Sequence, residues 1–303
     1  MIEPASFRVR LTQTLMRVLG LLPLRALHVL GYAVGALLRL FNTREYLVAR
    51  RNVDLCYAHL DARQRSAFVR DSLAQTAMGL TELPRVWGVA PHSALAQIKE
   101  IRGGELLRAA IARQRGVIVA APHLGQWELL NLYLSTQGPM ALLYRQPQHP
   151  AWEPLLLACR GVLGATQVRA DAAGVRVLYR CLRHKMIVGV LPDQRPKGGE
   201  GEFAPFFGVP CKSMTLLSRL ARKTDATVVF GFVERLSSGS GFCLHFLPAP
   251  EGIADEDLVL AVGALHQGLE HCVRVAPLQY QWTYKRFSIQ PGVEGDEMYP
   301  DCR

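Results

Sequence analysis

From Gly116 onwards, the sequence alternates between short apolar runs and longer stretches with helical periodicity. The apolar runs, which are rich in β-branched residues, are 117–121, 140–144, 186–191, 226–233 and 242–247. The helical stretches cover about 125–136, 151–163, 172–184, 213–223 and 256–274. Strands that alternate with helices usually pair in parallel and carry helices on both faces of the sheet. The sequence therefore predicts an α/β fold with a largely parallel central sheet flanked by helices.

One segment, 192–213, interrupts this alternation and is rich in proline and glycine. It joins a predicted strand to a predicted helix, which is where ligands gather in sheets of this kind. Loops of this length in compact domains are usually functional or mobile. We therefore expect an irregular loop at the ligand-binding edge of the sheet.

The first hundred residues have apolar spacing typical of helices, for example over 63–83, where Asp61 is a suitable N-cap. We expect the chain to divide into three parts. These are an N-terminal helical membrane-docking segment over 1–45, an α/β domain over 46–290 and a C-terminal tail over 291–303.

The N-terminal segment contains the most apolar part of the chain, but Arg25 and Arg39 leave only 26–38 uncharged. A spanning helix needs about 20 predominantly apolar residues, which is more than this stretch provides. Arginines on both sides would meet anionic headgroups, so the pattern predicts an interfacial or shallowly inserted anchor. A buried helical hairpin of a soluble domain remains an alternative, because short apolar runs are ambiguous.

The charge balance favours anionic partners. The chain has 35 Lys and Arg residues against 25 Asp and Glu residues, a formal charge of +10. Such a surface attracts phospholipid headgroups, phosphorylated substrates or acidic proteins. Nucleic acid also fits the charge, but the basic residues are not interleaved with aromatic residues in a recognisable binding module, so we expect no nucleic-acid partner.

The cysteines and histidines predict neither disulfides nor a metal. The seven cysteines form no CxxC pair, and their odd number argues against a closed disulfide framework. We expect reduced thiols in a cytoplasmic compartment. His266 and His271 are spaced five apart, unlike the zinc-binding pair of H-E-x-x-H, so we expect no metal.

His123 and Glu128 are the strongest candidates for catalysis. His123 follows the apolar run 117–121, and Gly125 permits a tight turn into the next helix. If His123 precedes that helix, Glu128 can reach back from its first turns. A carboxylate bound to one imidazole nitrogen leaves the other free to take a proton from a hydroxyl.

The rest of the chain limits what this pair can do. A G-x-S-x-G nucleophile elbow is missing from the sequence, so a covalent acyl-enzyme is not indicated. Direct attack by a substrate alcohol fits better. The alternative is structural: a glutamate in a first helical turn is favoured by the helix dipole, and a histidine at a strand end can be a satisfied core residue.

Five segments resemble the bacterial lipid A biosynthesis (late) acyltransferase family, within the H-x4-[DE] glycerolipid acyltransferases. In order they are RRNVDLCYAHLDARQR (50–65), APHLGQWELL (121–130), LYRQPQHP (143–150), LPDQRPKGGEGEFAPFFGVP (191–210) and PLQYQWTYKRF (277–287). His123 and Glu128 match the catalytic pair of that family. Gln126 stands where the family usually has Asn, and Leu278 where it has Glu, which bears on the identity of the acceptor.

The resemblance implies transfer of a fatty acyl chain from acyl carrier protein to a hydroxyl of a lipid A precursor. It places the reaction at the cytoplasmic face of a bacterial inner membrane and requires no cofactor. Acyl-CoA is an alternative donor. A lysophospholipid, ornithine lipid, glycolipid or polyene precursor is an alternative acceptor, and a catalytically silent lipid-binding membrane protein is an alternative function.

Further residues are candidates for binding the anionic lipid acceptor. Arg145 follows the run 140–144, and Arg195 and Lys197 lie in the long loop, so all three should share the sheet edge with His123. An arginine there can bind a phosphate or stabilise charge on the thioester oxygen. Asp193 is expected to orient a substrate group or to pair with Arg145, and a turn-forming role is the alternative. Gln126, within the His123 segment, completes the predicted substrate-binding set.

Overall fold

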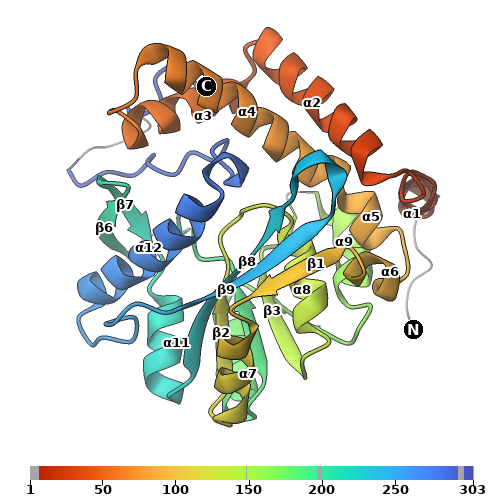
Figure 1. Cartoon of the computed structure of the whole chain (residues 1–303). Coiled ribbons are helices and arrows are strands. Elements are labelled where there is room, and N and C mark those ends of the chain that lie inside the picture. The colour runs from red at the N-terminus through yellow and green to blue at the C-terminus, as the bar shows by residue number, and fades with distance from the viewer. Residues whose placement is uncertain (1–6, 148, 197–199, 293–296, 303) are drawn as a thin grey trace.

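The central sheet has seven strands in the order β1-β9-β8-β2-β5-β3-β4 (Figure 1). The computed structural model describes residues 7–147, 149–196, 200–292 and 297–302. The strands of this sheet are β1 (Ile98–Arg102), β2 (Val117–Ala120), β3 (Met140–Tyr144), β4 (Thr166–Arg169), β5 (Ile187–Val190), β8 (Thr227–Arg235) and β9 (Phe242–Pro248). All neighbours pair in parallel except β8 and β9, which are antiparallel. The predicted α/β class with a largely parallel sheet is confirmed.

Helices cover both faces of this sheet, as predicted. They are α7 (Gly104–Ala112), α8 (Trp127–Leu134), α9 (Glu153–Arg160), α10 (Ala172–Arg183), α11 (Leu216–Thr224) and α12 (Leu258–Val275). Alternate residues of a strand point to opposite faces. Accordingly, Ile118 and Phe230 pack with Leu265 of α12 in one core, whereas Val119 packs with Leu129 of α8 in the other.

The proline- and glycine-rich segment contains a hairpin that the sequence did not predict. Strands β6 (Glu202–Phe206) and β7 (Val209–Ser213) pair antiparallel as a separate two-stranded sheet. Phe206 and Cys211 are fully buried in the core that includes α12. The expectation of an irregular loop over the whole of 192–213 is therefore wrong, because these buried side chains fix the hairpin on the body of the protein.

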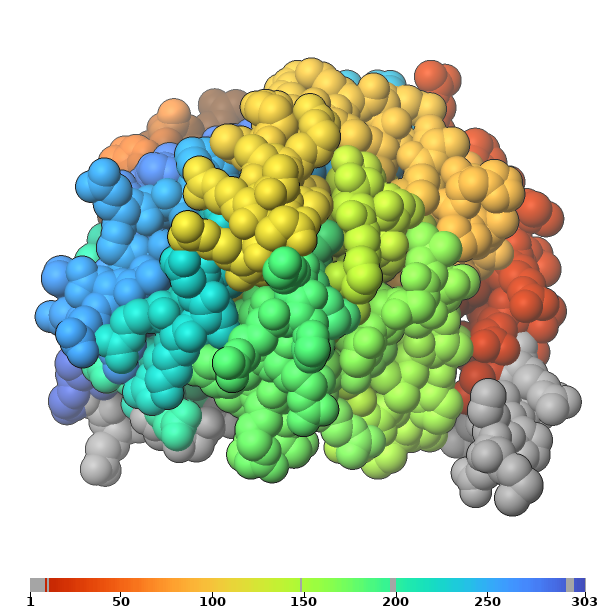
Figure 2. All heavy atoms as spheres, turned by 90° about the horizontal axis from the view of Figure 1, so that it is seen from below, coloured from red at the N-terminus to blue at the C-terminus, as the bar shows by residue number. Residues whose placement is uncertain are grey.

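Six helices precede the sheet and form a cap. They are α1 (Phe7–Leu19), α2 (Leu24–Leu40), α3 (Arg44–Cys56), α4 (Ala62–Thr81), α5 (Leu83–Trp87) and α6 (Pro91–Leu95). Helix α4 begins at the predicted N-cap, where the Asp61 side chain accepts from the N–H of Gln64 and the Gln64 side chain accepts from the N–H of Asp61. In Figure 1, α2, α3 and α4 lie over one end of the sheet. Seen from below, the other end is closed by the middle of the chain, coloured yellow to cyan, with α1 and α2 at the margin (Figure 2).

Helix α2 packs closely on α4 through glycines. A Cβ atom at Gly31 would lie 2.9 Å from the Cα atom of Met78, and one at Gly35 would lie 2.7 Å from the Cα atom of Ala74. In the described part of the chain, no single helix is long and apolar enough to cross a membrane. Only α1 and α2 together reach that length and hydropathy, and they are bent by 113° between 11–19 and 24–40.

The predicted C-terminal tail contributes to the core that lies on the α12 face of the sheet. Tyr299 is 1% exposed. Its hydroxyl donates to Asn52 Oδ1 in α3 (2.5 Å) and accepts from the backbone N–H of Phe287 (3.0 Å). The last residues that the structure describes are thus tied to the helical cap.

Candidate active site

The loop 121–126 leads from β2 into α8 through a tight turn. Gly125 has a φ angle of +60°, and a Cβ atom at this position would lie 1.8 Å from the carbonyl oxygen of Val233. The N–H of Gly125 donates to the carbonyl oxygen of Gln279 (3.1 Å). A glycine is required both by the left-handed backbone and by the close approach of β8. This turn fixes His123 at the carboxyl end of β2.

His123 is paired with Asp193 across the sheet edge. Its Nδ1 atom lies 2.7 Å from Oδ1 of Asp193, and its backbone N–H donates to Oδ2 at 2.8 Å. An ionised carboxylate only accepts, so Nδ1 carries a proton, and in a neutral ring the acceptor nitrogen is Nε2. The amide of Gln194 lies 3.4 Å from Nε2. The side chain of His123 is 17% exposed, which leaves the ring open to a substrate.

Asp193 is ionised at neutral pH although it is buried. Burial by itself raises the pKa of this carboxyl, but the charge of His123, the two hydrogen bonds from His123 and the more distant Arg286 outweigh it and lower the pKa below 3.8. A buried carboxylate beside an imidazole stabilises the imidazolium that forms when the ring takes a proton. His123 and Asp193 therefore have the geometry of a general base and its orienting acid.

Glu128 makes a different contact from the one predicted. It lies in the first turn of α8, and both of its oxygens accept hydrogen bonds from Arg160 at the end of α9. Nε of Arg160 donates to Oε2 (3.0 Å), and Nη2 donates to Oε1. Within the described residues, no hydrogen bond joins Glu128 to His123. The predicted pairing of these two side chains is wrong, because Asp193 occupies the place beside Nδ1 and Arg160 holds the carboxylate.

Arg160 retains a free donor group. Burial lowers the pKa of its guanidinium, but Glu128 outweighs this and raises it, so Arg160 is charged. Its side chain is 15% exposed, and among the described residues Nη1 has no hydrogen-bond partner. An anionic group of a substrate could occupy that donor.

Gln126 is buried between the His123 segment and the helical cap. It is 1% exposed, and its amide donates to the carbonyl oxygen of Gly79 in α4 (3.2 Å) and to Oε2 of Glu82 (3.1 Å). The role of Gln126 in binding the acceptor stays a prediction. Gln126 connects the His123 segment to the helical cap.

Glu82 is the centre of a buried network that the sequence did not reveal. It is fully buried and pairs with Arg235 of β8, whose Nη2 lies 2.7 Å from Oε2. Its Oε1 atom lies 2.6 Å from Nε2 of His28 in α2. Burial raises the pKa of Glu82, but Arg235 and His28 outweigh it and lower the pKa. The network joins α2, β8 and the loop 121–126 through one carboxylate.

The two predicted arginines share the expected edge of the sheet, since β2, β5 and β3 are adjacent and parallel. Arg145 follows β3, is exposed, and makes no hydrogen bond or ion pair within the described residues. The expected pairing of Asp193 with Arg145 is not formed, because Asp193 faces His123. Arg195 follows β5, and its Nη1 donates to Ser288 Oγ (2.7 Å). Lys197 lies outside the described residues.

Two of the motif segments meet behind the loop. Asn52 of α3 donates to the carbonyl oxygens of Trp282 (2.6 Å) and Tyr284 (2.8 Å). The N–H of Gln281 in turn donates to the carbonyl oxygen of His123 (2.9 Å). Segments 50–65 and 277–287 therefore support the loop 121–126 through these hydrogen bonds.

Sequence reasoning missed the partners of the two catalytic candidates. Asp193 was expected to contact a substrate or Arg145, and Arg160 was not considered. The partner of His123 depends on β5 lying next to β2, which spacing along the chain does not reveal. Arg160 ends a predicted helix, where a basic residue is also favoured by the helix dipole, so it gave no distinct signal.

Comparison with known proteins identifies the family of this chain. The family model described as bacterial lipid A biosynthesis acyltransferase matches residues 3–288. The chain is 26% identical over 271 residues to a lipid A biosynthesis lauroyltransferase of Escherichia coli (strain K12), covering 89% of this chain and 88% of the relative. It is 28% identical over 275 residues to a lipid A biosynthesis palmitoleoyltransferase of the same organism, covering 89% and 87%. The match extends over the helical cap, the sheet and the His123 site, and the chain therefore belongs to the bacterial lipid A biosynthesis acyltransferase family.

Proposed function

We propose that this protein transfers a fatty acyl chain from the thioester of acyl carrier protein to a hydroxyl of a lipid A precursor. The observation that carries the proposal is the contact between His123 and Asp193 at the carboxyl end of β2. It gives the family's transfer reaction a base with an available Nε2 atom. The positive charge of the chain, +10, favours an acidic donor protein and a phosphorylated acceptor.

In the proposed mechanism, Nε2 of His123 takes the proton of the acceptor hydroxyl as its oxygen attacks the thioester carbonyl carbon. Asp193 stabilises the imidazolium through the proton on Nδ1. The tetrahedral intermediate collapses, the carbon–sulfur bond breaks, and the imidazolium returns its proton to the departing thiolate. No covalent intermediate with the protein forms in this scheme.

Glu128 acts in this proposal through Arg160. Because Glu128 fixes Nε and Nη2 of the guanidinium, Nη1 is presented in a constant position. A cation there can stabilise developing negative charge on the thioester oxygen or hold a phosphate of the acceptor. Arg145, exposed on the same sheet edge, is a second cation for the acceptor.

Mass spectrometry of the products tests the reaction. The purified full chain would be offered acyl carrier protein or CoA donors, in combination with a phosphorylated disaccharide lipid or a lysophospholipid. We expect acylated disaccharide lipid with the carrier-protein donor and its loss in His123→Ala. If only lysophospholipid is acylated, the proposed acceptor is wrong. If transfer from acyl-CoA is faster than from acyl carrier protein, the proposed donor is wrong. Wild-type protein that binds lipid but transfers nothing would indicate a silent lipid-binding protein.

We also propose that α1 and α2 dock the protein on the cytoplasmic face of the inner membrane. Apolar side chains on these helices and in the turns beside them are exposed: Leu11, Leu15, Val18, Leu21, Val29, Leu30, Leu37, Leu40 and Phe41. Arg17, Arg25 and Arg39 are exposed beside them. An exposed apolar face of this size with flanking cations fits an anionic lipid surface.

Vesicle flotation tests the docking. Leu37→Glu combined with Leu40→Glu should reduce binding to vesicles that contain anionic phospholipid. Leu260→Glu is the matched control, because Leu260 is 60% exposed on α12. Equal binding by the two variants and the wild type would show that α2 is not the docking surface.

A further inference from the structure

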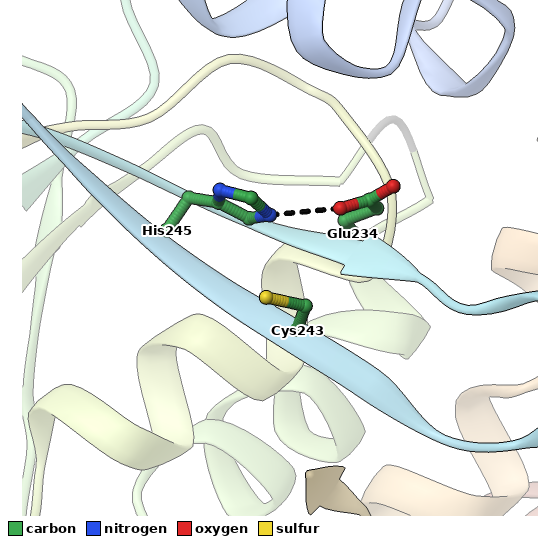
Figure 3. Close-up of side chains that lie close together, drawn as sticks. All are labelled: Glu234, Cys243 and His245. Carbon is green, nitrogen blue, oxygen red and sulfur yellow. Dashed lines mark hydrogen bonds and ion pairs between the residues drawn. The ribbon is translucent and has the colours of Figure 1, made fainter. Parts of the chain in front are cut away.

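Three side chains with different metal-binding atoms face one another on β8 and β9. They are Glu234, Cys243 and His245, and their ligand atoms all lie within 4.8 Å of one another (Figure 3). We infer that these residues form a binding site for a zinc-like divalent transition metal, separate from the His123 site. The site would fasten the outer part of the sheet, because β9 pairs with both β8 and β1.

The antiparallel register explains why the three groups converge. Glu234 of β8 lies directly opposite Cys243 of β9, and His245 is two residues further along β9 on the same face. The imidazole Nε2 lies 2.8 Å from Oε2 of Glu234. Ligand atoms around tetrahedral zinc lie roughly 3.3–3.7 Å apart, given metal–ligand distances of about 2.0–2.3 Å. Small side-chain rotations would bring the three atoms to that spacing.

Packing already orients the two buried ligands. The ring of His245 stacks on Phe232, with centroids 4.5 Å apart and planes at 4°. His245 is 4% exposed and Cys243 is fully buried. Ligands whose rotamers are fixed by their surroundings lose little conformational entropy when a metal binds.

Charge and access also suit a cation. Glu100 lies beside Cys243 across the β1–β9 pairing, interacts with its thiol, and is ion-paired with Arg102. A Cys243 thiolate with Glu234 and Glu100 would carry three negative charges, which a divalent ion and Arg102 together balance. The Glu234 side chain is 25% exposed, so one of the three ligands is open to solvent, and Glu234 also lines a cavity of about 830 Å³.

The mixed donor set selects the class of metal. Thiolate and imidazole ligands favour zinc and related transition metals over magnesium or calcium, which prefer oxygen ligands alone. Glu100 or a water molecule would complete four-coordination. Binding releases the Cys243 proton as the sulfur–metal bond forms. The sequence did not indicate this site, because its ligands come from two strands and contain no CxxC pair.

Metal content and cobalt spectroscopy test the inference on the full chain, freed of any histidine tag. After chelation and reconstitution, we expect one zinc ion per chain by elemental mass spectrometry. Cobalt in its place should give a thiolate-to-metal absorption band in the near ultraviolet. Zinc added to the chelated protein should raise the Tm by about 4 °C or more, since a ligand of the folded state alone stabilises it.

Variants assign the ligands. Cys243→Ser should remove the cobalt–thiolate band, and His245→Gln should lower zinc affinity at least tenfold. Cys181→Ser and His184→Gln remove a thiol and an imidazole from α10 and its C-cap, and should change neither. The inference fails if the wild-type protein takes up less than 0.1 equivalent, about a tenth of a site, or if the cobalt spectrum lacks the thiolate band. Either result would mean that His245 and Glu234 form only a hydrogen-bonded pair beside a protonated thiol. These readouts do not depend on acyl transfer, so they are independent of the proposed function.

Discussion

Nδ1 of His123 lies 2.7 Å from Oδ1 of Asp193, although the two residues are 70 positions apart in the chain. They meet because β2 and β5 are adjacent and parallel, with Ala120 paired to Val190, so both loops leave the same edge of the sheet. The contact fixes the tautomer of the imidazole and leaves Nε2 for the substrate. The histidine and its partner thus come from separate sequence segments.

Replacing Asp193 should impair catalysis more than folding. In Asp193→Asn, the amide can donate to the imidazole, which favours the wrong tautomer, and it no longer carries a charge to stabilise the imidazolium. We expect kcat to fall by about 10²- to 10⁴-fold. Steady-state kinetics measure this, with circular dichroism to verify folding.

The His123→Ala background tests whether the two residues act together. Residues that work as one unit are not additive, so adding Asp193→Asn to His123→Ala should cause little further loss. If the fold-losses in kcat of the two single variants multiply in the double variant, the two residues do not act as a pair, and Asp193 has an independent role.

Removing Arg160 should destabilise the protein because it leaves Glu128 buried and unpaired. The side chains of Arg160 and Glu128 are 15% and 3% exposed. Breaking a buried pair from one side costs about 3–5 kcal/mol of unfolding free energy. Denaturant unfolding of Arg160→Ala measures this cost.

The double variant Arg160→Met with Glu128→Gln separates stability from activity. It contains no unpaired buried charge, so most of the lost stability should return. Acyl transfer should remain low, because the cation at Nη1 is missing. Wild-type activity in the double variant would remove both residues from the mechanism.

The glycine in the catalytic turn should not tolerate a side chain. In Gly125→Ala, the new Cβ would lie 1.8 Å from Val233 O at a φ angle of +60°, so the turn must move away from β8. We expect a loss of about 2 kcal/mol or more in unfolding free energy, together with loss of activity.

Gly263 provides the matched control for this substitution. It lies within α12, and nothing lies within 4 Å of a Cβ atom built there. Gly263→Ala should therefore stabilise the protein by about 0.5–1 kcal/mol through helix propensity. If Gly125→Ala and Gly263→Ala destabilise the protein equally, the close approach of Gly125 to Val233 does not cause the loss of stability in Gly125→Ala.

Acid should destabilise the protein through His266. Its Nδ1 lies 3.0 Å from the carbonyl oxygen of Pro205, and its Nε2 lies 2.6 Å from Ser213 Oγ and 3.1 Å from Nη2 of Arg286. Burial, followed by the charge of Arg286, lowers the pKa of His266 from 6.5 to about 3. Between these two values the unfolded chain binds a proton that the folded protein does not, so stability falls as pH decreases.

The expected slope from this residue is at most about 1.4 kcal/mol per pH unit. Urea unfolding between pH 7 and pH 4 should show a shallower pH dependence for His266→Gln than for the wild type. His184→Gln is the control, since His184 is exposed after α10. An unchanged slope in His266→Gln would show that other groups control acid unfolding.

Several elements were predictable because their signal is local. The strand 140–144 coincides with β3, and 117–121 contains β2, since both are buried runs bounded by turn residues. The N-cap at Asp61 was predictable from its short side chain and the glutamine three residues later. These features need only the properties of neighbouring residues.

Other elements were missed because their stability comes from distant contacts. Strand β1 has charged residues and is mostly exposed, and its pairing with β9 provides the strand geometry. The β6–β7 hairpin contains Pro205 opposite Pro210, which resembles a loop in the sequence. It is held by the burial of Phe206, which depends on the position of α12.

The sequence by itself determined the α/β class, the family resemblance and the position of His123 after an apolar strand, because hydrophobic periodicity and ordered motifs are local properties. Only the tertiary structure decided which groups face one another. In the folded chain, Asp193 contacts His123, Arg160 contacts Glu128 and Glu82 contacts Gln126. Strand order and helix packing set these contacts, and neither is encoded in the spacing of residues along the chain.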